Sequence, residues 1–273
     1  MDLLATISSY FPSLSKSEKK VAQLILSSPD EVENLSINEL ALMAGVGEST
    51  IVRFARKIGL GGFQDLKIAL VKYQTAQKKI DYDEGDEVKD EIYRQFMESL
   101  QDTRNSIDQN QINQAAEMIH QAAHIYIFAV GTSGMVAMQL SNRLKRLGKF
   151  VEYGPDGQLQ SIYSTLTKPS DLVIAISTSG NTKEVIQNIE LAQENGVKVI
   201  TITNFINAPL THVGDLSLVA SSKMFYSDAG SFAAPINQLY LLDTLLKTLV
   251  ELAPDTYHGI RNLTNQALMK RLD

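Results

Sequence analysis

Cysteine is absent from this chain of 273 residues. Its absence excludes disulfides, thiolate metal sites and a cysteine nucleophile. Long apolar runs are also missing, and none approaches the roughly 20 residues that a membrane-spanning helix needs. The first residues, MDLLATISSYFPSLSKSEKK, lack the basic start and the apolar core of a secretory signal. We therefore expect a cytoplasmic protein that has no membrane partner.

An excess of positive charge is missing as well, because 25 basic and 31 acidic residues leave a formal net charge of −6. This balance argues against a protein that coats nucleic acid without sequence preference. The distribution is uneven: residues 78–110 carry 5 basic and 10 acidic side chains, whereas residues 38–77 carry 5 basic and 3 acidic ones. A local basic patch of this kind is sufficient for sequence-specific DNA binding.

Histidine is scarce, and the four histidines show no metal-binding spacing such as H-E-x-x-H. His120 and His124 precede the first expected strand, His212 lies on a connection, and His258 lies near the C-terminus. Each is interpreted as a surface or packing residue. We expect neither a metal nor an organic cofactor.

The N-terminal part of the chain has a helical pattern. Ser15 with Glu18, and Ser36 with Glu39, form two capping-box signatures ahead of apolar periodic stretches. A charged stretch at 78–91 then predicts a linker or a solvated helix start. Helices are predicted at 15–26, 36–43, 49–58 and 63–76, with one or two more within 92–123.

From Ile125 onward, apolar runs alternate with helical stretches. Strands that are apolar throughout and separated by helices indicate a parallel sheet covered on both faces. The predicted strands are 125–130, 150–153, 172–177, 197–203 and 216–219. The predicted helices are 135–147, 158–166, 183–195 and 235–252.

Residues 37–59, INELALMAGVGESTIVRFARKIG, fit a helix-turn-helix. Ala41 allows close helix crossing, Gly45 suits the left-handed turn, and Ile51 packs the second helix back. In this motif the N-terminal end of the second helix enters the major groove, where Arg53 can contact a guanine. The alternative is a three-helix bundle that only packs or dimerises. The expected DNA-binding residues are Ser36, Glu48, Ser49, Thr50, Arg53, Arg56, Lys57 and Lys67, of which Arg56, Lys57 and Lys67 are expected to contact phosphates.

The same region resembles the RpiR-type helix-turn-helix family. The matching stretches are LSKSEKKVAQLIL at 14–26 and residues 35–67, above all their tail GLGGFQDLK at 59–67. The resemblance covers nearly all of residues 1–77. It implies a winged or extended helix-turn-helix that binds operator DNA as a dimer.

Two similar turns follow apolar strands, AVGTSG at 129–134 and AISTSG at 175–180. Each opens a helix, and helix N-termini offer unpaired N–H groups and partial positive charge to a phosphate. Ligands of parallel sheets bind beyond the carboxyl ends of the strands, where both turns lie. The alternative is ordinary helix capping by serine and threonine. The repeated setting favours a phosphate site.

These turns resemble the two sugar-phosphate loops of the sugar isomerase (SIS) domain, GTSG at 131–134 and STSGNTKE at 177–184. The resemblance runs from about residue 110 to 250. It implies that Ser177, Thr178, Ser179 and Thr182 hold phosphate and that Ser133 touches the sugar, whereas Glu184 matches a recurrent acidic position. The expected phosphosugar-binding residues are Thr132, Ser133, Gly134, Ser177, Thr178, Ser179, Gly180, Asn181, Thr182 and Glu184.

We therefore expect an α/β protein, with an all-α helix-turn-helix domain followed by a doubly wound, parallel five-stranded αβα domain of the SIS type. The expected boundaries are 1–77 for the DNA-binding domain, 78–109 for a linker and connecting helix, 110–253 for the SIS domain and 254–273 for a helical tail. The expected function is transcriptional regulation of sugar metabolism, as a repressor. We expect a homodimer or homotetramer whose affinity for operator DNA is controlled by a sugar phosphate.

Two other functions remain open. A phosphosugar isomerase or lyase would need a base near the sugar. The segment 221–239 offers Asp228 but neither glutamate nor histidine, so we expect no enzyme and interpret Asp228 as a turn residue. A dinucleotide-binding protein would use Gly131 and an acid such as Glu152. However, Ser133 replaces the second glycine of that fingerprint, and the second turn would have no role.

Overall fold

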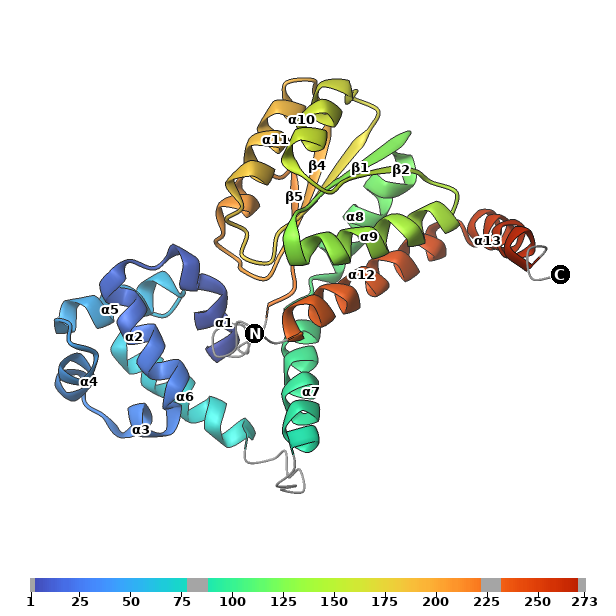
Figure 1. The fold of residues 1–273 in the computed structure, drawn as a ribbon. Helices are drawn as coiled ribbons and strands as arrows, with labels where there is room; N and C mark the ends of the chain where they lie inside the picture. The colour runs from blue at the N-terminus through green and yellow to red at the C-terminus, as the bar shows by residue number, and fades with distance from the viewer. Residues whose placement is uncertain (1–2, 78–87, 222–231, 270–273) are drawn as a thin grey trace. The chain divides into compact units, whose positions relative to one another are not determined.

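The computed structural model describes residues 3–77, 88–221 and 232–269. The chain divides into two compact units, whose elements are labelled in Figure 1. Unit 1 comprises Met1–Ser106, Phe205–Asn207 and Ser221–Ala234, and unit 2 comprises Ile107–Asn204, Ala208–Ala220 and Pro235–Asp273.

Unit 1 is helical. Both predicted capping boxes are present: Ser15 caps α2 with Glu18, and Ser36 caps α4 with Glu39. The helices are α1 (Leu3–Tyr10), α2 (Lys16–Ser27), α3 (Pro29–Asn34), α4 (Ile37–Ala44), α5 (Glu48–Lys57), α6 (Phe63–Gln77) and α7 (Val88–Ser106), with a 3-10 turn, η1 (Phe11–Ser13), after α1.

Two short helices of unit 1, α1 and α3, were not predicted from the sequence. Helix α1 contributes Leu4 and Ile7 to the core. Helix α3 has only six residues and begins with Pro29, whose fixed φ suits a first helical position. Both helices are too short to show a clear 3.6-residue periodicity, so tertiary packing decides their conformation.

The core of unit 1 packs the helix-turn-helix against α2 and α6. Leu40, Ile51 and Phe54 are fully buried, and Ala41 is 5% exposed. Gly45 ends α4 with a left-handed φ of 60°, as its place in the turn predicted. The chain therefore turns sharply between α4 and α5.

Unit 2 is built on a five-stranded, entirely parallel sheet, which confirms the predicted fold class. The strand order is β2-β1-β3-β4-β5. The strands are β1 (His124–Phe128), β2 (Phe150–Gly154), β3 (Leu172–Ile176), β4 (Lys198–Thr203) and β5 (Leu216–Val219). The two turns expected to bind phosphate follow β1 and β3, which are neighbours in the sheet.

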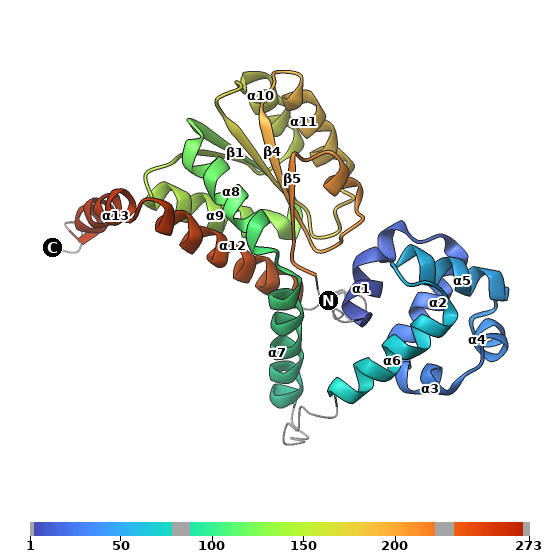
Figure 2. The same ribbon diagram turned by 180° about the vertical axis from the view of Figure 1, so that it is seen from behind.

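Helices cover both faces of this sheet (Figures 1 and 2). Central strand β3 shows why: Ile174 packs with α8, α9 and α12 on one face, whereas Val173 packs with α11 on the other. The helices are α8 (Gln109–Gln121), α9 (Gly131–Arg146), α10 (Gly157–Leu166), α11 (Lys183–Gln193), α12 (Ala233–Leu252) and α13 (Pro254–Met269), with a 3-10 turn, η2 (Pro209–His212). None of the described helices is both long enough and apolar enough to cross a bilayer.

One helix boundary in unit 2 differs from the prediction in a way that affects the site. Helix α9 begins at Gly131, whereas its predicted start was Met135. Gly131 takes a left-handed φ of 58°, which lets the helix start directly after the strand. The sequence TSG at 132–134 is therefore the first turn of a helix rather than a loop before it.

Candidate functional site

The two serine- and threonine-rich turns meet beyond the carboxyl ends of β1 and β3. The backbone N–H of Thr178 donates to Ser133 Oγ at 3.0 Å, and the hydroxyl oxygens of these two residues lie 3.2 Å apart. Ser133 is 7% exposed. Residues 45 positions apart in the sequence thus form one polar cluster.

Helices α9 and α11 both begin in this cluster without a side-chain cap. The side chains of their N-cap residues, Val130 and Thr182, accept no hydrogen bond from the N–H groups of the first helical turn. In the same unit, Asp108 and Asp156 cap α8 and α10 in the usual way. Ordinary capping therefore does not explain the two turns, and their first-turn N–H groups can serve an anion.

The second turn is organised by its own hydroxyls. Ser177 Oγ accepts from the N–H of Gly180 at 3.1 Å and lies 2.8 Å from Thr182 Oγ1. Ser179 Oγ accepts from the N–H of Asn181 at 3.2 Å. Ser177 is buried, whereas Ser179 and Asn181 are exposed. The turn is therefore held in shape from inside and offers polar groups outside.

Gly180 is required where it stands. Its φ of 61° lies in the left-handed region, and a Cβ atom there would overlap the Ala208 side chain and approach Thr203 Oγ1. Thr203 Oγ1 in turn donates to the carbonyl of Thr178 at 3.2 Å. The second turn is thus packed tightly against the end of β4.

The remaining predicted residues line the edges of the cluster. Thr132 is exposed on the first turn of α9, and Gly134 is buried against the hydroxyl of Tyr153. The carboxylate of Glu184 lies over Gly157 at the start of α10, where a Cβ atom would overlap it. Glu184 therefore packs against the neighbouring helix start, which agrees with a structural role.

Sequence analysis missed Gln238 on α12. Its Nε2 donates to Asn204 Oδ1 at 2.7 Å and lies 3.5 Å from Thr178 Oγ1. Asn204 Nδ2 donates to the carbonyl of Ala220, which fixes the orientation of both amides. Among the described residues, Gln238 Oε1 then has no hydrogen-bond partner, although it is buried. No motif marked Gln238, because it lies some 60 residues from the second turn.

Tyr153, at the end of β2, was also missed. Its hydroxyl lies against Gly134 in the first turn of α9. Burial raises the pKa of this phenol above its ordinary value, so it remains protonated at neutral pH. Tyr153 can therefore both donate and accept a hydrogen bond at the edge of the cluster.

The predicted DNA-reading helix, α5, begins after Gly47 without a side-chain cap. Glu48, Ser49 and Arg53 are exposed, as expected for residues that face a ligand. Thr50 belongs to the same N-terminal part of α5 and was expected to be exposed as well, and this expectation is wrong: its exposed fraction is only 6%. Its hydroxyl accepts from Arg53 Nη2 at 3.3 Å, so it orients the arginine.

The other predicted DNA contacts are engaged within unit 1. Lys57 Nζ donates to the carbonyl of Ser13 and pairs with Glu18 at 3.3 Å, and Lys67 Nζ donates to the carbonyl of Leu35 at 2.8 Å. Contacts to DNA would compete with these bonds. Ser36 is occupied as a cap, and Arg56 Nε donates to the carbonyl of Gly61 at 3.4 Å.

No cluster of three metal-ligating side chains occurs among the described residues. His120 Nδ1 lies 2.8 Å from the hydroxyl of Tyr257, and His124 lies 3.6 Å from a carboxylate oxygen of Asp171. Asp228, interpreted above as a turn residue, lies outside the described residues.

Known protein families match both parts of the chain, and single relatives match nearly its whole length. The helix-turn-helix domain of the rpiR family matches residues 1–77, and the SIS domain matches residues 118–248. An uncharacterized HTH-type transcriptional regulator of Haemophilus influenzae is 31% identical over 92% of this chain and 90% of its own length. The chain belongs to the RpiR family of transcriptional regulators. The HTH-type transcriptional regulator HexR of Escherichia coli is 35% identical to this RpiR-family regulator over 80% of the chain and 77% of HexR.

Solved structures agree with this assignment. The NanR protein of Vibrio vulnificus, in complex with ManNAc-6P, aligns with 98% of the RpiR-family regulator and 98% of its own chain, at a TM-score of 0.65 and 30% identity. The sugar isomerase domain of an RpiR transcription factor from Sphaerobacter thermophilus aligns with 66% of this chain and 98% of its own, at a TM-score of 0.60. At 22% identity, the second match shows the fold alone.

Proposed function

We propose that a sugar phosphate binds where α9 and α11 begin and thereby controls the affinity of α5 for operator DNA. The observation that carries this proposal is the meeting of two uncapped helix starts, joined by the bond between Ser133 and Thr178. An anion there would accept hydrogen bonds from the N–H groups of two helix starts and from the hydroxyls of Ser179 and Thr182.

The sugar part of the ligand would lie near the carboxyl ends of β1 and β2. The hydroxyl of Tyr153, at the end of β2, is a polar group at the edge of the cluster and lies against Gly134 in the first turn of α9. NanR, with a phosphorylated amino sugar bound, supports a ligand of this class.

Control of DNA binding follows from linkage. A ligand shifts an equilibrium between two arrangements by the difference in its affinity for them. We propose a cytoplasmic homodimer or homotetramer, because a second copy supplies the second α5 that a two-fold operator needs. The chain acts as a regulator and not as an isomerase, in agreement with the names of its relatives.

A thermal-shift screen of hexose, pentose and amino-sugar phosphates tests the effector site. A true effector raises the melting temperature with dose. The variant Ser179→Ala/Thr182→Ala should lose this response, because each lost charge-assisted hydrogen bond costs about 1.5–3 kcal/mol. A response to NAD instead, or an undiminished response in the double variant, contradicts the proposal. Turnover of any sugar phosphate would identify an enzyme.

Operator binding tests α5 separately. Arg53→Ala should weaken binding to operator DNA and leave the thermal shift by the sugar phosphate unchanged. Thr50→Val is the matched variant, since it removes the hydroxyl that orients Arg53 while the arginine stays. It should weaken operator binding less than Arg53→Ala does. Equal operator affinity in wild type and Arg53→Ala would show that Arg53 does not contact the operator.

A further inference from the structure

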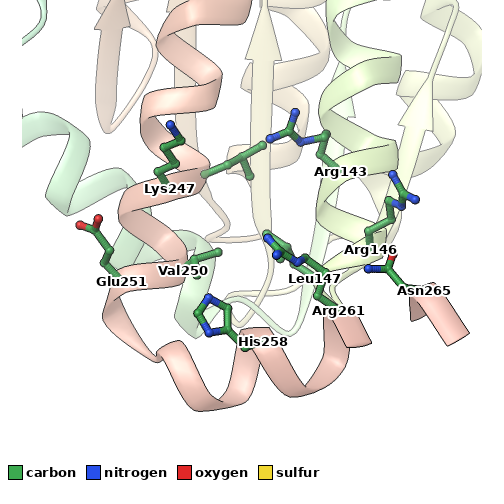
Figure 3. Close-up of a pocket in the computed structure, with 10 residues that line it drawn as sticks. Arg143, Arg146, Leu147, Lys247, Val250, Glu251, His258, Arg261 and Asn265 are labelled. Atoms are coloured by element: carbon green, nitrogen blue, oxygen red, sulfur yellow. The ribbon is translucent and has the colours of Figure 1, made fainter. Parts of the chain in front are cut away.

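A hollow of about 560 Å³ lies on unit 2 between α9, α12 and α13. Four basic side chains from three helices surround it: Arg143 and Arg146 from α9, Lys247 from α12 and Arg261 from α13 (Figure 3). We call it the basic hollow. Such a concentration of positive charge is notable in a chain whose formal net charge is −6.

The charge of the basic hollow is only partly neutralised from within. Asp243 pairs with Arg143 at 2.6 Å and lies 3.9 Å from Lys247, so two cations share one carboxylate. Among the described residues, Arg146 and Arg261 have no carboxylate within 4.0 Å. Glu251 also lines the hollow, but Figure 3 shows its carboxylate directed away from the arginines.

Helix dipoles explain only part of this cluster. Arg143 and Arg146 lie in the last turn of α9, where basic residues complement the exposed carbonyls. Lys247 and Arg261 lie in the interiors of α12 and α13, where no such effect acts. The gathering of these cations around one hollow therefore points to a bound anion.

The shape of the basic hollow favours a small molecule. Leu147, Leu246 and Val250 line it between the charged side chains, so it has apolar walls as well as cations. Guanidinium groups match phosphate oxygens with two parallel hydrogen bonds. Several cations that come from three helices suit a ligand with more than one anionic group.

We propose that the basic hollow binds a compact polyanion with adjacent phosphate groups. This site is separate from the two turns that open α9 and α11. The turns lie at the start of α9 and the hollow at its end, about 22 Å along the 16-residue helix. The proposal therefore does not depend on the sugar-phosphate assignment.

Titration of the full-length protein with inorganic pyrophosphate, followed by calorimetry, tests the site. Wild type should bind one pyrophosphate per chain, and more tightly than inorganic phosphate. Arg146→Gln/Arg261→Gln should weaken binding at least tenfold. The control Lys145→Gln/Lys168→Gln removes the same number of positive charges from exposed positions that do not line the hollow. It should bind as wild type does.

Three outcomes would overturn the proposal. One is unsaturable binding that both double variants weaken equally, since this indicates general charge screening. Another is loss of pyrophosphate binding in Ser179→Ala/Thr182→Ala, since this places the anion in the two turns. The third is a variant Arg146→Gln/Arg261→Gln that binds pyrophosphate normally but changes oligomeric state in light scattering. That result would assign the hollow to acidic groups of a second copy.

Discussion

The α-helix starts whose caps the structure describes, those of α2 to α5 and of α8 to α11, fall into two groups. Serine or aspartate side chains cap α2, α4, α8 and α10. Helices α5, α9 and α11 begin without such a cap, as does the six-residue α3. A cap satisfies N–H groups that would otherwise need water or a ligand. Among these eight helices, the longer uncapped ones are α5, which we propose to bind operator DNA, and α9 and α11, which we propose to bind a sugar phosphate.

Adding a capping side chain to an uncapped helix start is the strongest test of this comparison. Thr182→Asp places a favoured capping residue at the start of α11. The carboxylate should occupy the N–H groups that a phosphate needs and repel the phosphate as well. We expect sugar-phosphate affinity to fall about 1,000-fold, roughly 4 kcal/mol, while the free energy of unfolding stays equal or rises.

Two further variants separate the causes. Thr182→Val removes the hydroxyl without adding charge and should cost about 1.5–3 kcal/mol of binding. Thr165→Asp adds the same charge at an exposed position on α10 and should leave affinity unchanged. Calorimetric titration with the effector measures all three. Full affinity in Thr182→Asp would show that α11 does not hold the phosphate.

Glycines offer a second test, because Gly180 and Gly196 both have left-handed φ values, 61° and 76°. A Cβ at Gly196 meets only Pro169, at 3.6 Å, whereas at Gly180 it overlaps Ala208. Gly196→Ala should cost about 1–2 kcal/mol of unfolding free energy for the left-handed backbone alone. Gly180→Ala should cost about 1–3 kcal/mol more, because it adds overpacking. Urea unfolding checks this, and equal losses would contradict the tight packing of the second turn.

A serine that caps a helix should contribute to the free energy of unfolding, whereas a serine in the first turn of an uncapped helix should contribute little. Ser36→Ala removes the cap of α4 and should lower the free energy of unfolding by about 1 kcal/mol. Ser49, in the first turn of the uncapped α5, is exposed. Ser49→Ala should change stability by less than about 0.5 kcal/mol. Thermal melts of both variants make the comparison, and a Ser49→Ala loss as large as that of Ser36→Ala would refute it.

Local sequence signals predicted much of this fold. The capping boxes, the left-handed turn at Gly45 and the five parallel strands each depend on residues close together in the chain, or on apolar runs that mark buried strands. The two turns could be found for the same reason, since strand, hydroxyls and glycine stand within a few residues. Burial of Thr50 was missed because its orientation depends on how α5 packs against the rest of unit 1.

Contacts between residues that are far apart in the sequence could not be predicted from it. Gln238 contacts Thr178 of the second turn, which is 60 positions away in the sequence. Tyr153, on β2, lies against Gly134 in α9. Neither residue carries a motif. The engagement of Lys57 with Ser13, 44 residues away, was hidden for the same reason. A surface cation in the sequence is equally consistent with a phosphate contact and with an internal bond.

The smallest expected effect is the loss of unfolding free energy at low pH, and it should differ between capped and uncapped helix starts. Burial acts to raise the pKa of Glu18, but hydrogen bonds from Ser15 and Lys57 outweigh it and hold the pKa below its ordinary value. Hydrogen bonds from Ser36 likewise lower the pKa of Glu39. A carboxyl with a lowered folded-state pKa stabilises the fold above its unfolded pKa, about 4.3 for glutamate, and that stability is lost as pH falls through the folded pKa.

Acid should therefore weaken the capped starts of α2 and α4, whereas the N-caps of α9 and α11, Val130 and Thr182, do not titrate. Urea unfolding of wild type and Glu18→Gln between roughly pH 7 and pH 3 measures the difference. Glu18→Gln should be less stable at pH 7 and should lose less stability on acidification. Parallel pH profiles would mean that this capping box contributes nothing electrostatic, and that caps and open starts differ in hydrogen bonding alone.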